Sequence, residues 1–280
     1  MLLLIPIAVD VPMARWPWMN WAIIALTIIF LPIADAGDSN IGAWCVAGGE
    51  HWLGHLLHPL AHLDVIHLFG NMLFLWVFGN AICAKIGNLP YLAVYFVGAL
   101  LGSLITSVLN PTPGIGASGA INTVVGFFLA WYALNDVRMF LLLIIRPITF
   151  ELAAYWVILM WLAFDVWGAL GGDGFVDYVA HVMGFLLGFG AAIALLKLGW
   201  VTMDDDERSI LDILKDRAPI GEEPTSARKA IQVRIPLPTP DNARPTGQPS
   251  QQRRPAPKRV EEDPIPLADE PTQPKEKRSF

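Results

Sequence analysis

The chain has 280 residues, of which 54% are hydrophobic and only 16% charged, and its formal net charge is −6 at pH 7. A soluble domain of this length carries more charge, so the composition excludes an ordinary soluble protein and predicts one that crosses a membrane several times. The negative charge gives no support for nucleic-acid binding.

The first 17 residues are expected to form an N-terminal cytoplasmic segment. The apolar run over residues 1–9 has no basic residues before it and no small-residue cleavage site after it. We therefore expect no cleaved signal peptide.

Six stretches have the apolarity and approximate length of a membrane-spanning helix, which needs about 20 residues. They cover residues 18–33, 65–84, 91–109, 117–134, 152–170 and 178–196. The sequence thus predicts an all-α polytopic fold with a six-helix domain over residues 18–198. The apolar part of residues 137–150 is too short to span, and we interpret this stretch as an interfacial connector.

The basic residues test this topology independently. Before position 196 the chain contains only four of them, namely Arg15, Lys85, Arg138 and Arg146. Six spans place all four on one side of the membrane, which the positive-inside rule makes the cytoplasmic side. Both termini are therefore expected in the cytoplasm, and a bacterial inner membrane is the expected location.

Ser118 and His181 are polar residues within these apolar helices, and polar groups at membrane depth are costly and usually functional. A hydroxyl and an imidazole are the minimum set for nucleophilic catalysis. Ser118 falls in the first turn of its predicted helix, where unpaired N–H groups favour an oxyanion. His67 and Asn71 share one face of the second predicted helix because they are four residues apart.

Small residues indicate how two of these helices could approach closely. Ala180, Gly184, Gly188 and Ala192 recur every four residues in the last span, and Gly116, Ala117, Gly119 and Ala120 surround Ser118. Contact between these faces would bring Ser118 within hydrogen-bonding reach of His181. The alternative is that these small residues serve helix packing alone.

Three motifs in order along the chain resemble those of the rhomboid intramembrane serine proteases. Residues 116–119 (GASG) resemble the family's GxSG nucleophile motif, and residues 180–188 resemble its AHxxGxxxG motif. Residues 62–71, with His62, His67 and Asn71, resemble HxxxxHxxxN. The resemblance covers residues 20–196 and implies a six-helix rhomboid-like bundle.

The resemblance implies a role for each matching residue. Ser118 would be the nucleophile and His181 its general base, in a dyad without a carboxylate. The Ser118 backbone N–H, His67 and Asn71 would stabilise the oxyanion. The expected supporting residues are His62, Gly116, Gly119, Asn122, Gly184 and Gly188. The implied substrates are transmembrane proteins within the lipid bilayer, and neither a cofactor nor a metal is expected.

Two positions depart from the family pattern. Asn122 stands where an aromatic residue often stacks on the catalytic histidine, and Trp52 is followed by Leu53 where the family often has Trp-Arg. The first departure leaves the orientation of His181 open. Asp165 is the only acidic residue deep in a span, but nothing in the sequence fixes it near His181, and we do not assign it to a triad.

Other classes of function are weighed against this one. His51, His55, His58 and His62 would form one stripe on a continuous helix, as in a metal-binding transporter or metalloenzyme, but Pro59 interrupts such a helix. A soluble α/β hydrolase would need G-x-S-x-G, which the chain lacks at this serine. A non-catalytic membrane scaffold is a further alternative.

The composition changes sharply near position 198, after which 13 of the 22 prolines and 14 of the 19 Lys and Arg residues follow. Residues 199–218 are expected to contain a short amphipathic helix. Residues 219–280 are rich in proline and mixed charges, which predicts a disordered cytoplasmic tail.

Overall fold

The computed structural model describes residues 2–35, 44–49, 51–109, 113–143, 146–171, 176–204 and 207–216. The predicted disordered tail, residues 219–280, lies outside these ranges.

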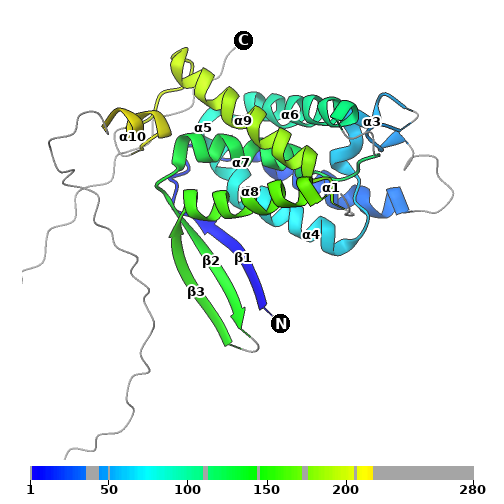
Figure 1. Ribbon diagram of the computed structural model, residues 1–280, viewed down its shortest axis with the longest axis horizontal. Coiled ribbons are helices and arrows are strands. Elements are labelled where there is room, and N and C mark those ends of the chain that lie inside the picture. Colours follow the sequence, from blue (N-terminus) through cyan, green and yellow to red (C-terminus); the bar gives the residue numbers. More distant parts are fainter. Residues whose placement is uncertain are drawn as a thin grey trace, which may run out of the picture. The chain divides into compact units, whose positions relative to one another are not determined.

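Helices occupy all six stretches in which spans are predicted (Figure 1). They are α1 (Trp18–Asp35), α4 (Val65–Phe74) continued by the π-helical turn η2 (Leu75–Gly79) and α5 (Asn80–Ile86), α6 (Asn88–Leu109), α7 (Ser118–Tyr132), α8 (Ala154–Gly171) and α9 (Tyr178–Lys197). The short helices α3 (Gly54–Leu57) and η1 (His58–Leu60) precede α4, and α10 (Ile210–Asp216) follows α9.

Within the described residues, four helical segments are long and apolar enough to cross a membrane. They are Val65–Ile86, Asn88–Leu109, Ala154–Gly171 and Tyr178–Lys197. Among the described residues, Trp18–Leu31 of α1 counts as a shorter apolar helix, and α7 has 15 residues. The described part of the chain is therefore mostly helical with four candidate spans.

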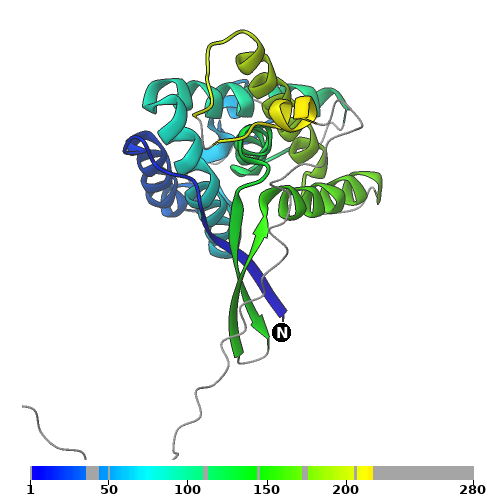
Figure 2. The same cartoon turned by 90° about the vertical axis from the view of Figure 1, so that its left-hand side faces the viewer.

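Helix α7 lies in the middle of the other helices (Figures 1 and 2). Every residue from Gly119 to Tyr132 except Asn122 is buried. A helix enclosed by protein on all sides does not need the length of a lipid-facing helix, which explains why α7 is shorter than the spans around it.

Glycines allow α9 and α6 to pack directly on α7. A Cβ atom at Gly184 would overlap the carbonyl oxygen of Gly119, and one at Gly188 would overlap that of Thr123. On the other side, a Cβ at Gly98 of α6 would lie 2.6 Å from the Thr123 side chain. The predicted contact between the small-residue faces around Ser118 and His181 is therefore present.

A three-stranded antiparallel sheet extends from the helices (Figure 1) and corrects the all-α prediction. It consists of β1 (Leu2–Val9), β2 (Asp136–Leu143) and β3 (Arg146–Ala153), in the order β1-β2-β3. The stretch interpreted as an interfacial connector thus supplies two strands. The register of β1 against β2 shifts between Pro6 and Ala8, at a proline that cannot donate a backbone hydrogen bond.

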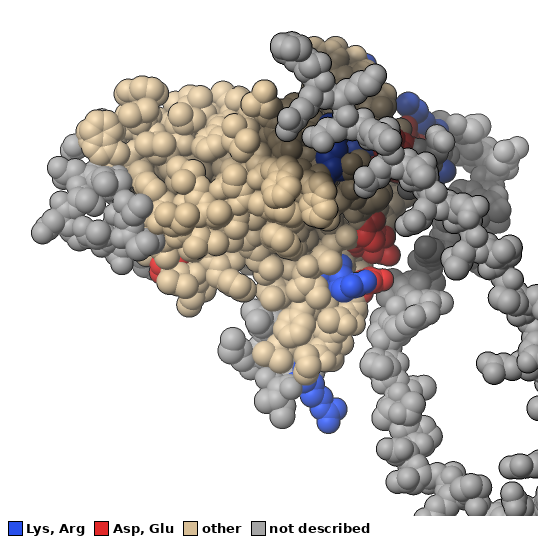
Figure 3. Space-filling model, turned by 180° about the vertical axis from the view of Figure 1, so that it is seen from behind, with Lys and Arg blue, Asp and Glu red and all other residues tan. Residues whose placement is uncertain are grey.

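On the face seen in Figure 3, charged side chains are few, and most of those visible lie toward one end. The side chain of Lys85, at the end of α5, is 10% exposed and contacts both Asp204 and Glu207. Glu207 also accepts a hydrogen bond of 3.0 Å from the Tyr132 hydroxyl. These contacts fix the segment after α9 against the ends of α5 and α7.

Candidate active site

Ser118 is the first residue of α7, and the turn before it depends on Gly116. Gly116 has φ +114°, a backbone conformation that residues with a Cβ rarely adopt. A Cβ there would also lie 2.7 Å from Cε1 of His67. Gly116 therefore both forms the turn and allows His67 to lie against it.

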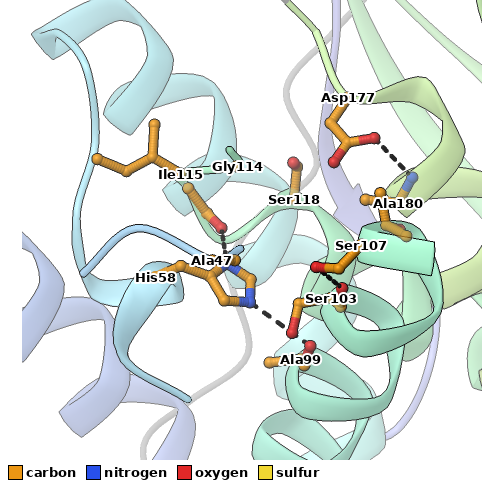
Figure 4. A pocket seen from close by; sticks show the side chains of 13 residues that line it. Ala47, His58, Ala99, Ser103, Ser107, Gly114, Ile115, Ser118, Asp177 and Ala180 are labelled. Carbon is orange, nitrogen blue, oxygen red and sulfur yellow. Dashed lines mark hydrogen bonds between the residues drawn. The ribbon is translucent and has the colours of Figure 1, made fainter. Parts of the chain in front are cut away.

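His58 holds this turn from the other side (Figure 4). Its backbone carbonyl accepts a hydrogen bond from Gly116 N, and its ring Nδ1 lies 3.0 Å from the Gly116 carbonyl oxygen. Burial lowers the pKa of His58, which favours a neutral ring whose Nδ1–H donates to that carbonyl. The Ser118 side chain points away from this ring (Figure 4).

The start of α4 positions His67 and Asn71. The carboxylate of Asp64 caps the helix by accepting hydrogen bonds of 2.8 Å from the backbone N–H groups of Ile66 and His67. Asn71 follows His67 by one helical turn, so the two side chains lie on one face.

His62 fixes the orientation of the Asn71 amide. Its Nε2 lies 2.8 Å from Asn71 Nδ2, and its ring centroid lies 5.0 Å from that of His67. Burial lowers the pKa of His62 to about 4, so Nε2 accepts a hydrogen bond from the amide. A primary amide has two N–H donors, and the second remains for another acceptor.

His181 lies in the first turn of α9, whose backbone is capped by Asp177. Its Nδ1 lies 3.0 Å from Oδ1 of Asp165 on α8, and the two side chains are 14% and 16% exposed. The expectation that Asp165 is not fixed near His181 is therefore wrong. The sequence could not supply this contact because it depends on how α8 is rotated against α9.

Asn122 does not take over the role of the aromatic residue that often stands at its position in the rhomboid family. Its amide nitrogen donates a 3.0 Å hydrogen bond to the Ser118 carbonyl on its own helix. The aromatic ring beside His181 is instead that of Tyr178, with ring centroids 6.0 Å apart in an edge-to-face arrangement.

A cavity of about 330 Å³ brings these side chains together. His67 and Asn71 reach it from α4, Ser118 and Asn122 from α7, Asp165 from α8 and His181 from α9. Its apolar lining includes Phe74, Trp161, Phe164 and Phe185. The cavity thus combines a hydroxyl, imidazoles and an amide with a surface that suits an apolar peptide segment.

The remaining histidines do not form the metal-binding stripe that was weighed as an alternative. His51 stacks on Trp44 with ring centroids 3.9 Å apart, and His55 Nδ1 lies 3.1 Å from the hydroxyl of Ser103. His58 and His62 contact Gly116 and Asn71, as described above. Among the described residues, no three His, Cys, Asp or Glu side chains lie together as metal ligands would.

Asp165 is the residue of this site whose contact the sequence analysis missed. The available signal was that it is the one acidic residue deep in a predicted span, because intramembrane ionisable residues are functional candidates by default. Tyr178 was also missed, and no sequence pattern pointed to it.

Comparison with known proteins identifies the fold that carries this cavity. The sequence model of the rhomboid domain family matches residues 49–198, a range that contains all the predicted site residues. The chain belongs to the rhomboid family. It is accordingly an integral membrane protein.

Individual relatives agree with this assignment. The chain is 32% identical over 191 residues to rhomboid protease GluP of Bacillus subtilis (strain 168), which covers 64% of this chain and 35% of GluP. It is 30% identical over 138 residues to presenilin-associated rhomboid-like proteins of Danio rerio and Mus musculus, covering 48% of this chain and 35% of each relative. The matched regions thus span about a third of the length of these relatives.

Proposed function

We propose that this rhomboid protein is an intramembrane serine endopeptidase that hydrolyses peptide bonds in or near the transmembrane segments of membrane-protein substrates. The observation that carries the proposal is the cavity, in which Ser118 and His181 occur together with His67 and Asn71. The proposal is also supported by the relative named as a rhomboid protease.

Ser118 acts as the nucleophile in this proposal. Its Oγ attacks the carbonyl carbon of the scissile peptide bond while His181 Nε2 takes the hydroxyl proton. The protonated His181 then gives this proton to the leaving amine, and an acyl-enzyme ester on Ser118 remains. Water hydrolyses the ester with His181 again acting as the base, which restores the serine.

The oxyanion that forms during attack is stabilised by three groups in this proposal. The Ser118 backbone N–H is free at the first turn of α7, because the first four N–H groups of a helix have no partner within it. The His67 side chain and the free Asn71 N–H supply the other donors. Loss of one such donor typically lowers turnover about 10²–10³-fold.

The proposed arrangement in the membrane follows from the charges. We propose six spans over residues 18–198, with both termini in the cytoplasm of a bacterial cell and the cavity opening toward the outer face. The N-terminal segment of residues 1–17, the segment of residues 199–218 that contains α10, and the tail of residues 219–280 are then cytoplasmic.

Ser118→Ala in the full chain tests the proposal. Wild-type protein in proteoliposomes should cleave a model single-span substrate and should be labelled by a fluorophosphonate, whereas Ser118→Ala should do neither. Ser209→Ala is the matched control. Its buried hydroxyl donates a hydrogen bond to Asp212 of α10, and neither residue lines the cavity, so cleavage should persist. Cleavage that survives in Ser118→Ala would show that Ser118 is not the nucleophile.

A further inference from the structure

Packing of α8 against α9 does not explain the presence of the Asp165 carboxylate. The described part of α8, Ala154–Gly171, is otherwise uncharged, and an ionisable group within a span is costly. Close packing of α8 on α9 comes from other residues, because a Cβ at Gly168 would lie 2.5 Å from the Tyr178 ring. The Asp165 side chain therefore has another role than filling this interface.

The contact of Asp165 with His181 determines which ring nitrogen carries the proton. An ionised carboxylate only accepts hydrogen bonds, so a 3.0 Å contact from Oδ1 to Nδ1 requires Nδ1–H. In neutral imidazole the other nitrogen, Nε2, then has a free lone pair. A general base that takes a proton from Ser118 needs this tautomer.

Asp165 is also the polar partner that holds the His181 ring in place. The Asn122 amide donates its hydrogen bond to the Ser118 carbonyl on its own helix. Tyr178 contacts the His181 ring edge-to-face, an aromatic contact that does not fix which ring nitrogen is protonated. The hydrogen bond from Nδ1 to Asp165 therefore sets both the tautomer and the rotation of the ring.

We propose that Asp165 is a positioning residue that completes a Ser118-His181-Asp165 triad. It keeps His181 in the Nδ1–H form before attack. When the Ser118 proton moves to Nε2, the carboxylate lies beside the resulting imidazolium, and opposite charges in close contact stabilise each other most where water is scarce. Asp165 itself gains no proton in this step. The inference rests on the proposed peptidase function and extends it beyond a dyad.

Replacement of Asp165 in the full chain tests this role kinetically. Asp165→Asn and Asp165→Ala should each lower kcat by about 10²–10⁴-fold, as loss of the orienting carboxylate does in serine proteases. KM should change by less than about fivefold, since the carboxylate acts through His181. Asp165→Asn should be no better than Asp165→Ala, because its amide N–H would donate to Nδ1 and stabilise the wrong tautomer. A merely structural role predicts the opposite order, since Asn preserves the shape.

Asp177→Asn is the matched control for removal of a carboxylate near His181. Asp177 caps α9 by accepting a hydrogen bond of 3.0 Å from Ala180 N, and asparagine caps helices equally well. This variant should keep kcat within about threefold of wild type.

The tautomer of His181 can be measured without any cleavage. The sample is ¹⁵N-histidine-labelled Ser118→Ala protein in nanodiscs at pH 8, and the NMR signal of His181 is the one that a His181→Gln change removes. This signal should show a protonated Nδ1 and an unprotonated Nε2. Adding Asp165→Asn should invert this pattern. A His181 ring protonated at Nε2 in the protein with Asp165 intact would overturn the inference, even if the Asp165 variants do not fold.

The two proposals fail in different ways. Wild-type protein that cleaves no substrate while His181 shows the expected tautomer would contradict the peptidase function alone. Cleavage by wild type together with an unchanged kcat in Asp165→Asn would leave the dyad in place and remove Asp165 from the mechanism.

Discussion

At the scale of single residues, the environment decides the role of each polar group. Six histidines are present, and each of the five near the start of α4 has a distinct surrounding. His58 and His62 are buried, with pKa values lowered by burial, and hold Gly116 and Asn71 in place. His67 instead lines the cavity. One residue type thus serves as a structural anchor at two positions and as a candidate oxyanion donor at a third.

Gly116 joins the backbone turn to the position of His67, and we expect Gly116→Ala to lower activity strongly. The new Cβ would require a strained φ of +114° and would lie 2.7 Å from His67 Cε1. Displacement of His67, a proposed oxyanion donor, predicts a loss of kcat of about 10²-fold or more. Cleavage kinetics of the purified variant measure this effect.

Gly102→Ala is the control for Gly116→Ala. Gly102 lies inside α6, and a Cβ there would meet no atom within 4 Å. Alanine is about 1 kcal/mol more favourable than glycine within a helix, so this variant should be active and at least as stable as wild type. Full activity in Gly116→Ala would show that the turn tolerates a side chain and that His67 does not depend on it.

At the scale of elements, the contact between α7 and α9 brings the serine and the histidine together. The glycines of α9 allow its backbone to touch the carbonyl oxygens of α7, so that contact is set by backbone atoms rather than by flexible side chains. Rigid helices can hold a catalytic geometry more exactly than loops can.

We expect Gly188→Ala to weaken this interface. Its Cβ would overlap the Thr123 carbonyl oxygen, which belongs to the backbone and cannot rotate away. Overpacking of this kind typically costs about 1–3 kcal/mol, and the shift of α9 should also reduce cleavage. The apparent melting temperature in detergent micelles and the cleavage rate measure the two effects.

Gly190→Ala lies on the same helix and provides the matched control. A Cβ at Gly190 would meet no atom within 4 Å. The melting temperature should therefore stay the same or rise slightly. Equal melting temperatures for the two variants would contradict the role of close backbone packing.

At the scale of the whole described part of the chain, residues far apart in sequence form contacts at the ends of the helices. Lys85 and Glu207 are 122 positions apart and form a buried ion pair to which Tyr132 also bonds. The sheet also joins distant parts of the chain, since β1 (Leu2–Val9) pairs with β2 (Asp136–Leu143).

We expect Glu207→Gln to destabilise the protein by about 2 kcal/mol, because among the described residues it leaves the buried charge of Lys85 with only the exposed Asp204 as a partner. Glu151→Gln is the control, since the pair of Arg138 with Glu151 is about half exposed and should contribute less than about 1 kcal/mol. Denaturation of both variants in mixed micelles tests this difference, and equal effects would contradict it.

Part of the fold could be predicted because membrane helices are specified locally. A run of apolar residues must form its hydrogen bonds within itself when water is absent, so helices occur in all six expected stretches. The sheet could not be predicted in the same way. β1 is an apolar run without a two-residue alternation, and its strand pairing is non-local.

The sequence by itself determined the membrane character, the positions of the helices and the family motifs around Ser118, His181, His67 and Asn71, because each depends on composition or on spacing within one helix. Only the tertiary structure decided the sheet, the buried pair of Lys85 with Glu207 and the contact of Asp165 with His181. These features depend on how separate elements are rotated and packed against each other. Spacing along the chain carries no information about that rotation.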